Sequence, residues 1–158
     1  MARYITPTLT ITSNKFSATS NPGPTSSPIN ISVSDLLDVT QVDSNIVTVS
    51  TTGATLLTLT NYTAAGSGGS LEGTDGAFVF LRNLTEGLTV APNIFIGHNV
   101  TNAELDSAEA GDEDRLMTLK PGEFAFFPWD MEANLNVDAS AAADDALEVI
   151  VFVRTGTA

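Results

Sequence analysis

The amino-acid sequence predicts an all-β protein, an antiparallel β-sandwich with jelly-roll-like topology and about nine or ten short strands. Three observations support this prediction. Short apolar or alternating segments recur roughly every ten residues. Gly, Pro, Asn and Asp cluster between these segments, where turns are expected. No segment has the apolar spacing of a convincing amphipathic helix.

The composition indicates one folded core and an acidic surface. The chain has 158 residues, of which 42% are hydrophobic and 16% are charged. Residues 1–70 contain 25 Ser or Thr, a composition that suits strands and turns. The net charge is −13, and it is unevenly placed: residues 1–70 hold three acids and two bases, whereas residues 71–158 hold sixteen acids and four bases.

This composition disfavours several functions. Binding to nucleic acid or to an anionic membrane needs clustered Lys and Arg, which the sequence lacks, so we expect neither partner. The chain contains no Cys, which excludes disulfides, thiolate metal sites and a Cys nucleophile. The N-terminal residues lack the apolar segment of a signal peptide, and no apolar run approaches the roughly 20 residues of a membrane span. We therefore expect a soluble chain made in the cytosol.

The N-terminal residues alternate between apolar and Thr side chains, which predicts a strand with one buried face. Ile5, Pro7, Leu9 and Ile11 form the apolar set, and Thr6, Thr8, Thr10 and Thr12 form the other. The alternative is an arm that orders only on meeting a partner. Residues 20–28 contain three Pro and one Gly, which predicts a loop. The expected organisation is an N-terminal arm and Pro-rich loop over residues 1–28, followed by a β-sandwich domain over residues 29–158.

Further strands are expected around apolar residues along the rest of the chain. Residues 77–81 are apolar without alternation and are placed centrally with both faces covered. Residues 94–96 form a short interior strand, and residues 147–153 form a strand in the middle of a sheet. Residues 34–38 are expected to form one helical turn or an irregular bridge. The other expected strands contain Ile29, Ile31 and Val33; Val47 and Val49; Leu57 and Leu59; and Leu135, Val137 and Ala139.

Pro121-Gly122 predicts a type II turn, because Pro presets φ at the first central position and Gly accepts the positive φ of the next. Apolar runs flank this dipeptide, so a β-hairpin is expected. Its second strand places Phe124, Phe126, Phe127 and Trp129 in one packed layer. Pro128 removes a ladder donor, which predicts that this strand lies at a sheet edge or bends there.

Candidate chemical sites are few. His98 is the only histidine and is interpreted as a residue at the end of a strand. The six acids of residues 104–114 are either a solvated loop or a Ca²⁺ site, although the spacing of a Ca²⁺-binding loop is missing. Residues 72–76 are a weaker cation candidate, and residues 66–69 lack the Lys of a phosphate loop. Four Asn-X-Ser/Thr sequons, at Asn30, Asn61, Asn83 and Asn99, are interpreted as chance matches. We expect no catalytic residue, no cofactor and no metal.

The C-terminal third resembles a known class of proteins. Residues 119–130, Leu-Lys-Pro-Gly-Glu-Phe-Ala-Phe-Phe-Pro-Trp-Asp, precede Asn134-Leu135-Asn136-Val137 and the apolar run that starts at Leu147. This order is similar to small virion structural proteins of tailed bacteriophages, marine and cyanophages among them, of the head decoration or cement type. The resemblance covers about 40 residues, and its motif is structural. Residues 1–70 show no such resemblance.

The resemblance implies a non-enzymatic virion protein that binds the outer capsid surface and stabilises the head. It also implies assembly as a homotrimer, contact with the major capsid protein or other virion proteins, and synthesis in the host bacterial cytoplasm. The expected partner-binding residues are those of the N-terminal arm: Ile5, Thr6, Pro7, Thr8, Leu9, Thr10, Ile11 and Thr12. Alternatives are a tail, fibre or head-tail connector component and a carbohydrate-binding β-sandwich module. A cupin-like enzyme is disfavoured because its metal site needs several His.

Overall fold

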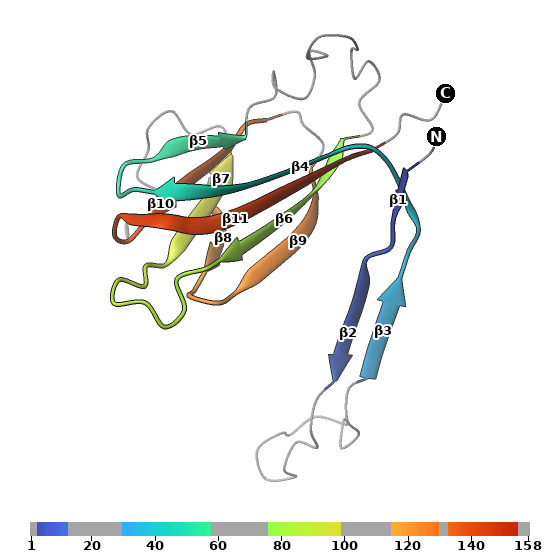
Figure 1. The fold of residues 1–158 in the computed structure, drawn as a ribbon, viewed down its shortest axis with the longest axis horizontal. Coiled ribbons are helices and arrows are strands. Elements are labelled where there is room, and N and C mark those ends of the chain that lie inside the picture. The colour runs from blue at the N-terminus through green and yellow to red at the C-terminus, as the bar shows by residue number, and fades with distance from the viewer. Residues whose placement is uncertain (1–2, 13–29, 58–75, 99–114, 130–132, 155–158) are drawn as a thin grey trace. The chain divides into compact units, whose positions relative to one another are not determined.

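The computed structural model describes residues 3–12, 30–57, 76–98, 115–129 and 133–154, and these ranges contain eleven strands and no helix (Figure 1). The expected all-β antiparallel class is confirmed. The strands are β1 (Arg3–Ile5), β2 (Thr8–Thr12), β3 (Asn30–Ser34), β4 (Leu37–Val49), β5 (Ala54–Leu57), β6 (Ala77–Asn83), β7 (Ile94–His98), β8 (Arg115–Leu119), β9 (Phe124–Trp129), β10 (Leu135–Ala139) and β11 (Ala143–Arg154).

The chain divides into two compact units, Met1–Val39 and Thr40–Ala158. The boundary expected from the sequence, between residues 28 and 29, lies outside the described residues. In the first unit, β2 and β3 form a two-stranded antiparallel ribbon in which Leu9 pairs with Val33. Strand β1 pairs with the first three residues of β4. Residues 35 and 36 form an irregular link between β3 and β4, and not a helical turn.

The strand expected at residues 5–12 is confirmed only over Thr8–Thr12, because Ile5 ends β1 and residues 6 and 7 form a link. The expectation that its apolar face is buried is wrong. Leu9 is 50% exposed and Val33, directly opposite, is 58% exposed. A strand in a two-stranded ribbon has one neighbour, so its side chains gain little cover from the pairing alone. The two apolar side chains therefore remain in contact with solvent.

Two antiparallel sheets share one core, and all of their strands except β1 and the first three residues of β4 belong to the second unit. The five-stranded sheet has the order β1-β4-β11-β6-β9, and the four-stranded sheet has the order β5-β10-β7-β8. Buried residues of both sheets belong to the same hydrophobic cluster, including Val79 and Val151 from the first and Ile96 and Val137 from the second. Folding removes the apolar side chains of this shared cluster from water, which is the main force that stabilises the two sheets.

The expected interior positions of β6, β7 and β11 are confirmed. Strand β11 lies between β4 and β6, β6 lies between β11 and β9, and β7 lies between β10 and β8. The expectation that both faces of β6 are covered is only half right. Val79 and Leu81 are fully buried in the core, whereas Phe78 and Phe80 on the opposite face are half-buried. That face is partly covered by neighbouring rings of the same sheet.

The turn at Pro121-Gly122 is confirmed, but the hairpin is wrong. Gly122 has φ of 82°, and the amide of Glu123 donates to the Lys120 carbonyl oxygen at 2.9 Å. The flanking strands do not pair: β8 pairs with β7 in the four-stranded sheet, and β9 pairs with β6 in the five-stranded sheet. The turn therefore carries the chain from one sheet to the other. Strand β9 ends the sheet order, which confirms the edge position expected from Pro128.

Asn83 holds this crossing in place. Its Nδ2 donates to the carbonyl oxygens of Pro92 at 2.9 Å and Leu119 at 3.0 Å, and its Oδ1 accepts from the Thr85 hydroxyl at 2.6 Å. The Asn83 carbonyl also accepts from the Gly122 amide at 3.0 Å. Asn83 is fully buried, so the sequon that it begins belongs to a structural hydrogen-bond network.

Candidate interaction surface

The outer face of β11, β6 and β9 gathers five of the chain's eight phenylalanines. Successive side chains of a strand point to opposite faces, so the residues between the core positions of these strands share one side. We call this surface the aromatic face. Its members are Phe78, Phe80, Arg82, Phe124, Phe126, Pro128, Glu148, Ile150, Phe152 and Arg154.

The strand register arranges most of these residues in three rows across the sheet. The first row is Glu148, Arg82 and Phe124, and the second is Ile150, Phe80 and Phe126. The third row is Phe152, Phe78 and Pro128. Cross-strand neighbours in such rows lie close enough for their side chains to touch. The face is therefore a continuous apolar surface with charged groups at its ends.

Ring contacts connect the rows of the aromatic face. Phe78 and Phe126 stack with ring centroids 5.5 Å apart and planes within 8°, and Phe80 and Phe124 stack at 6.1 Å. Phe126 also meets Phe152 edge-on at 6.3 Å. Each such pair contributes about 0.5–1.5 kcal/mol beyond the burial of its area. These contacts hold the rings in fixed positions on the sheet.

The edge of this face remains open to solvent. Phe124 is 61% exposed and Phe126 is 39% exposed. The expectation that the aromatic residues of 124–129 form one packed layer is therefore wrong, because Trp129 is buried in the core while Phe124 points outward. Contiguous exposed apolar side chains on a soluble domain are typical of an interaction surface.

Basic side chains border the aromatic face. The Arg154 guanidinium carbon lies 4.1 Å from the centroid of the Phe78 ring, a cation–π contact. The Arg154 Nε is buried, and no hydrogen-bond partner for it occurs in the described part of the chain. Arg82 is exposed, and Glu148 is half-buried directly opposite it. Aromatic and Arg side chains together are the combination enriched at protein interfaces.

The partner-binding residues expected from the sequence, Ile5 to Thr12, lie in the first unit and contribute nothing to the aromatic face. Ile5 ends β1, residues 6 and 7 form a link, and residues 8–12 form β2. Tyr4, 56% exposed, and Leu36, 62% exposed, belong to the same unit. The first unit therefore presents its own exposed apolar side chains.

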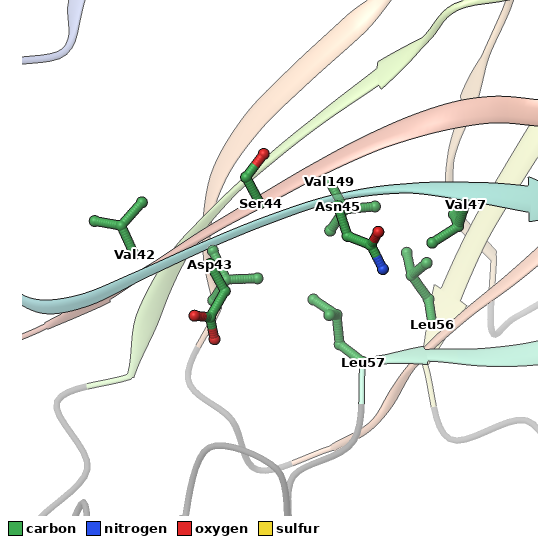
Figure 2. A pocket seen from close by; sticks show the side chains of 9 residues that line it. Val42, Asp43, Ser44, Asn45, Val47, Leu56, Leu57 and Val149 are labelled. Carbon is green, nitrogen blue, oxygen red and sulfur yellow. The ribbon is translucent and has the colours of Figure 1, made fainter.

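A pocket of about 460 Å³ lies between β4, β5 and β11 (Figure 2). Figure 2 shows Asp43 and Asn45 on one side of β4, with Val42 and Ser44 on the other. Asp43 is the one ionisable group among the described residues that line the pocket, and its Oδ2 accepts a hydrogen bond from Gln41 Nε2 at 2.7 Å. The other lining residues are Val47, Leu56, Leu57, Val149 and Val151. No sequence signal indicated this pocket, because β11 lies far in the chain from the consecutive strands β4 and β5 that form its other walls.

The candidate chemical residues are dispersed. His98 is the last residue of β7, which confirms it as a strand-end residue, and its buried Nδ1 has no hydrogen-bond partner among the described residues. Asp138 is fully buried, and its Oδ1 accepts from the Ala139 amide at 2.7 Å. Residues 66–69, 72–75 and 104–114 lie outside the described residues. Within the described ranges, no group of three or more His, Asp or Glu could hold a metal ion.

No protein-family model matches the chain, and neither a curated protein nor a solved structure matches it. The described segments also contain no helix that is long and apolar enough to cross a membrane.

Proposed function

We propose that this protein is a non-enzymatic structural component of a tailed-phage virion, a decoration or cement protein that binds the outer capsid surface and stabilises the head. One observation carries the proposal: the β2–β3 ribbon of the first unit pairs two apolar residues, Leu9 and Val33, that are both exposed. The resemblance of residues 119–130 to phage virion proteins supports the same function. The shared core of the two sheets supports a β-sandwich of jelly-roll type.

Attachment proceeds through strand addition by the N-terminal ribbon. Within the described residues, β2 pairs only with β3, so each strand of the ribbon has one edge available for main-chain hydrogen bonds. An extended segment or sheet edge of a capsid protein can pair with this edge, while the capsid covers Leu9 and Val33. Of the expected residues Ile5 through Thr12, this assigns the binding role to Thr8–Thr12 of β2, with Val33 as a contributor from β3.

Charge and copy number fit an outer position. A net charge of −13 repels packaged DNA, so electrostatic repulsion favours a position on the outside of a shell over one on its inside. A small ribbon gives a weak contact. Assembly as a trimer, which the resemblance implies, multiplies weak contacts because all copies engage the shell together.

The direct test is the composition of purified particles of the phage that encodes this chain. Quantitative mass spectrometry is expected to find the chain in a fixed, high ratio to the major capsid protein, and gold-labelled antibody is expected to mark the outer head. Absence from particles contradicts the proposal. A few copies located at the tail would instead support the tail, fibre or connector alternative.

Variants of the ribbon test the attachment site. Deleting residues 1–12, or replacing Leu9 and Val33 by Ser, is expected to abolish incorporation into particles. Leu88→Ser is the matched control, because Leu88 is 54% exposed and lies in the other unit. Incorporation that is unchanged by both ribbon variants would show that attachment uses another surface.

A carbohydrate-binding module is the second candidate, and the aromatic face is the observation that favours it. Exposed rings such as Phe124 and Phe126 can stack on sugar faces. Sugar recognition also needs many hydrogen-bonding groups, and this face offers only Arg82, Glu148 and Arg154. Binding to a glycan array that disappears in Phe124→Ala and persists in Leu9→Ser would favour this function over capsid decoration.

A further inference from the structure

The outward side chains of β11 follow a pattern that complements itself. In order they are Glu148, Ile150, Phe152 and Arg154, which is an acid, two apolar residues and a base. All four are half-buried, and all lie on the aromatic face. When the same four residues of a second chain run in the opposite direction, each charge meets its opposite and each apolar residue meets an apolar residue.

A two-fold axis between Ile150 and Phe152 produces this arrangement. Glu148 of one copy then faces Arg154 of the other, and the same pair recurs on the other side of the axis. Ile150 of each copy faces Phe152 of the other. Phe80 and Phe126 lie in the row of Ile150, and Phe78 and Pro128 lie in the row of Phe152. Contacts that use the same patch on both subunits are the most common way in which identical chains associate.

We infer that the aromatic face binds the aromatic face of a second copy of this chain, with Glu148 of each copy paired to Arg154 of the other. Charge supports this occupant. The chain carries a net charge of −13, so most of its surface repels another copy, whereas the face has Arg82 and Arg154 against Glu148 alone. Two copies can therefore meet at this face without the repulsion between like negative charges that the net charge produces elsewhere.

The size of the face sets the strength of the contact. Strands about 4.8 Å apart, with rows about 6.8 Å apart along them, give the three strands and their three rows a footprint of roughly 300 Å². Stable interfaces bury about 800 Å² per partner. The dimer is therefore weak and concentration-dependent in solution, and it strengthens where copies are held close together.

This association is separate from the attachment proposed above, since it uses the second unit and the attachment uses the first. An isologous contact closes at two copies, so it joins neighbouring molecules and does not build a ring. A chain that fails to dimerise can still enter particles, and a chain that dimerises can still be absent from them.

Sedimentation velocity over a range of protein concentrations tests the inference. The wild type is expected to shift from monomer to dimer, and the shift is expected to weaken as salt rises. Glu148→Lys and Arg154→Glu each place two like-charged pairs across the two-fold axis, so each is expected to weaken dimerisation by at least about tenfold. Lys120→Glu makes the same change of charge as Arg154→Glu, but outside the face, and is expected to leave the dimer unchanged.

Restoration by complementary charges is the decisive result. An equimolar mixture of the Glu148→Lys and Arg154→Glu proteins pairs opposite charges at both positions, so dimers are expected to return. The double variant Glu148→Lys/Arg154→Glu is expected to dimerise alone for the same reason. Circular dichroism of each protein confirms that the fold is retained, which separates loss of the contact from loss of structure.

Phe124→Ser tests the apolar part of the face without disturbing the core, because Phe124 is 61% exposed. It is expected to abolish the dimer in a folded protein. The inference is overturned by a wild type that remains monomeric at millimolar concentration, or by a dimer or trimer that none of these variants changes. A monomeric wild type that binds glycans through Phe124 also overturns it and assigns the face to a sugar.

Discussion

Asn83 donates a hydrogen bond to the carbonyl oxygen of Leu119 at 3.0 Å, although Asn83 ends a strand of the five-stranded sheet and Leu119 ends a strand of the four-stranded sheet. This bond joins the two sheets beside the Pro121-Gly122 turn. The two residues are 36 positions apart in the chain. A buried amide with satisfied partners thus determines where the chain changes sheets.

Asn83→Ala is expected to lower the free energy of unfolding by about 2–4 kcal/mol, because it leaves two buried carbonyl oxygens and the Thr85 hydroxyl without their partner. Urea denaturation monitored by Trp129 fluorescence measures the change. Asn45→Ala is the control: Asn45 is exposed, its Oδ1 accepts only from the neighbouring Ile46 amide, and its loss is expected to cost under about 0.5 kcal/mol. Equal losses in the two variants would contradict the role given to Asn83.

Gly122→Ala and Gly87→Ala separate the free-energy cost of a strained backbone conformation from that of a steric clash. Gly122 has φ of 82° and Gly87 has φ of 79°, so an L side chain is strained at both positions by about 1–2 kcal/mol. A Cβ at Gly122 also lies 2.5 Å from Glu86 Oε2, whereas a Cβ at Gly87 meets nothing within 4 Å.

Gly122→Ala is therefore expected to be the more destabilising of the two in chemical denaturation. Alanine at position 86 lacks the two nearest obstructing atoms, Oε2 and Cδ, and keeps only the Cβ at 3.3 Å. Most of the additional cost is therefore expected to disappear when Gly122→Ala is made in a Glu86→Ala background. A difference between the two glycines that persists in that background would place its cause elsewhere in the turn.

Stacking on the aromatic face is expected to contribute to stability. Phe78 and Phe126 lie 5.5 Å apart with nearly parallel planes. A double-mutant cycle with Phe78→Leu and Phe126→Leu is expected to give a coupling free energy of about 0.5–1.5 kcal/mol. The same cycle for Phe78 and Phe124, which make no ring contact with each other in this structure, is expected to give a value near zero. Coupling of equal size in both cycles would show a general effect of losing apolar area.

The sequence was sufficient for the all-β antiparallel class, the turn at Pro121-Gly122, the edge position of Pro128 and the interior position of β11. Each depends on local chemistry or on period-two patterning. The predicted pairing of β8 with β9 was wrong. Two apolar strands on either side of a tight turn normally indicate a hairpin, and only contacts with residues distant in the chain show that the two strands belong to different sheets. Asn83 makes such contacts, with Leu119 and Gly122, but its sequence context showed only a strand end and a sequon.

The aromatic face was not predicted because both faces of β9 are apolar. Ala125, Phe127 and Trp129 alternate with Phe124, Phe126 and Pro128, so periodicity cannot tell which set faces the core. Register with β6 decides the question, since Val79 lies opposite Phe127 while Phe80 lies opposite Phe126. The exposure of Leu9 was missed for a related reason: alternation predicts an apolar face but does not show what covers it.

Pro128 is expected to protect the free edge of β9 from pairing with other chains. It lies opposite Phe78 in the register with β6 and has no N–H, so the missing donor is one that would otherwise face outward from the sheet. Pro128→Thr supplies that donor and a residue that favours strands, and it is expected to increase irreversible aggregation on heating. Static light scattering during a thermal ramp measures this aggregation.

Thr118→Val, a strand-favouring change on the edge strand β8 that adds no donor, is the control. If Pro128→Thr scatters no more light than Thr118→Val, the edge of β9 is protected by something other than its proline.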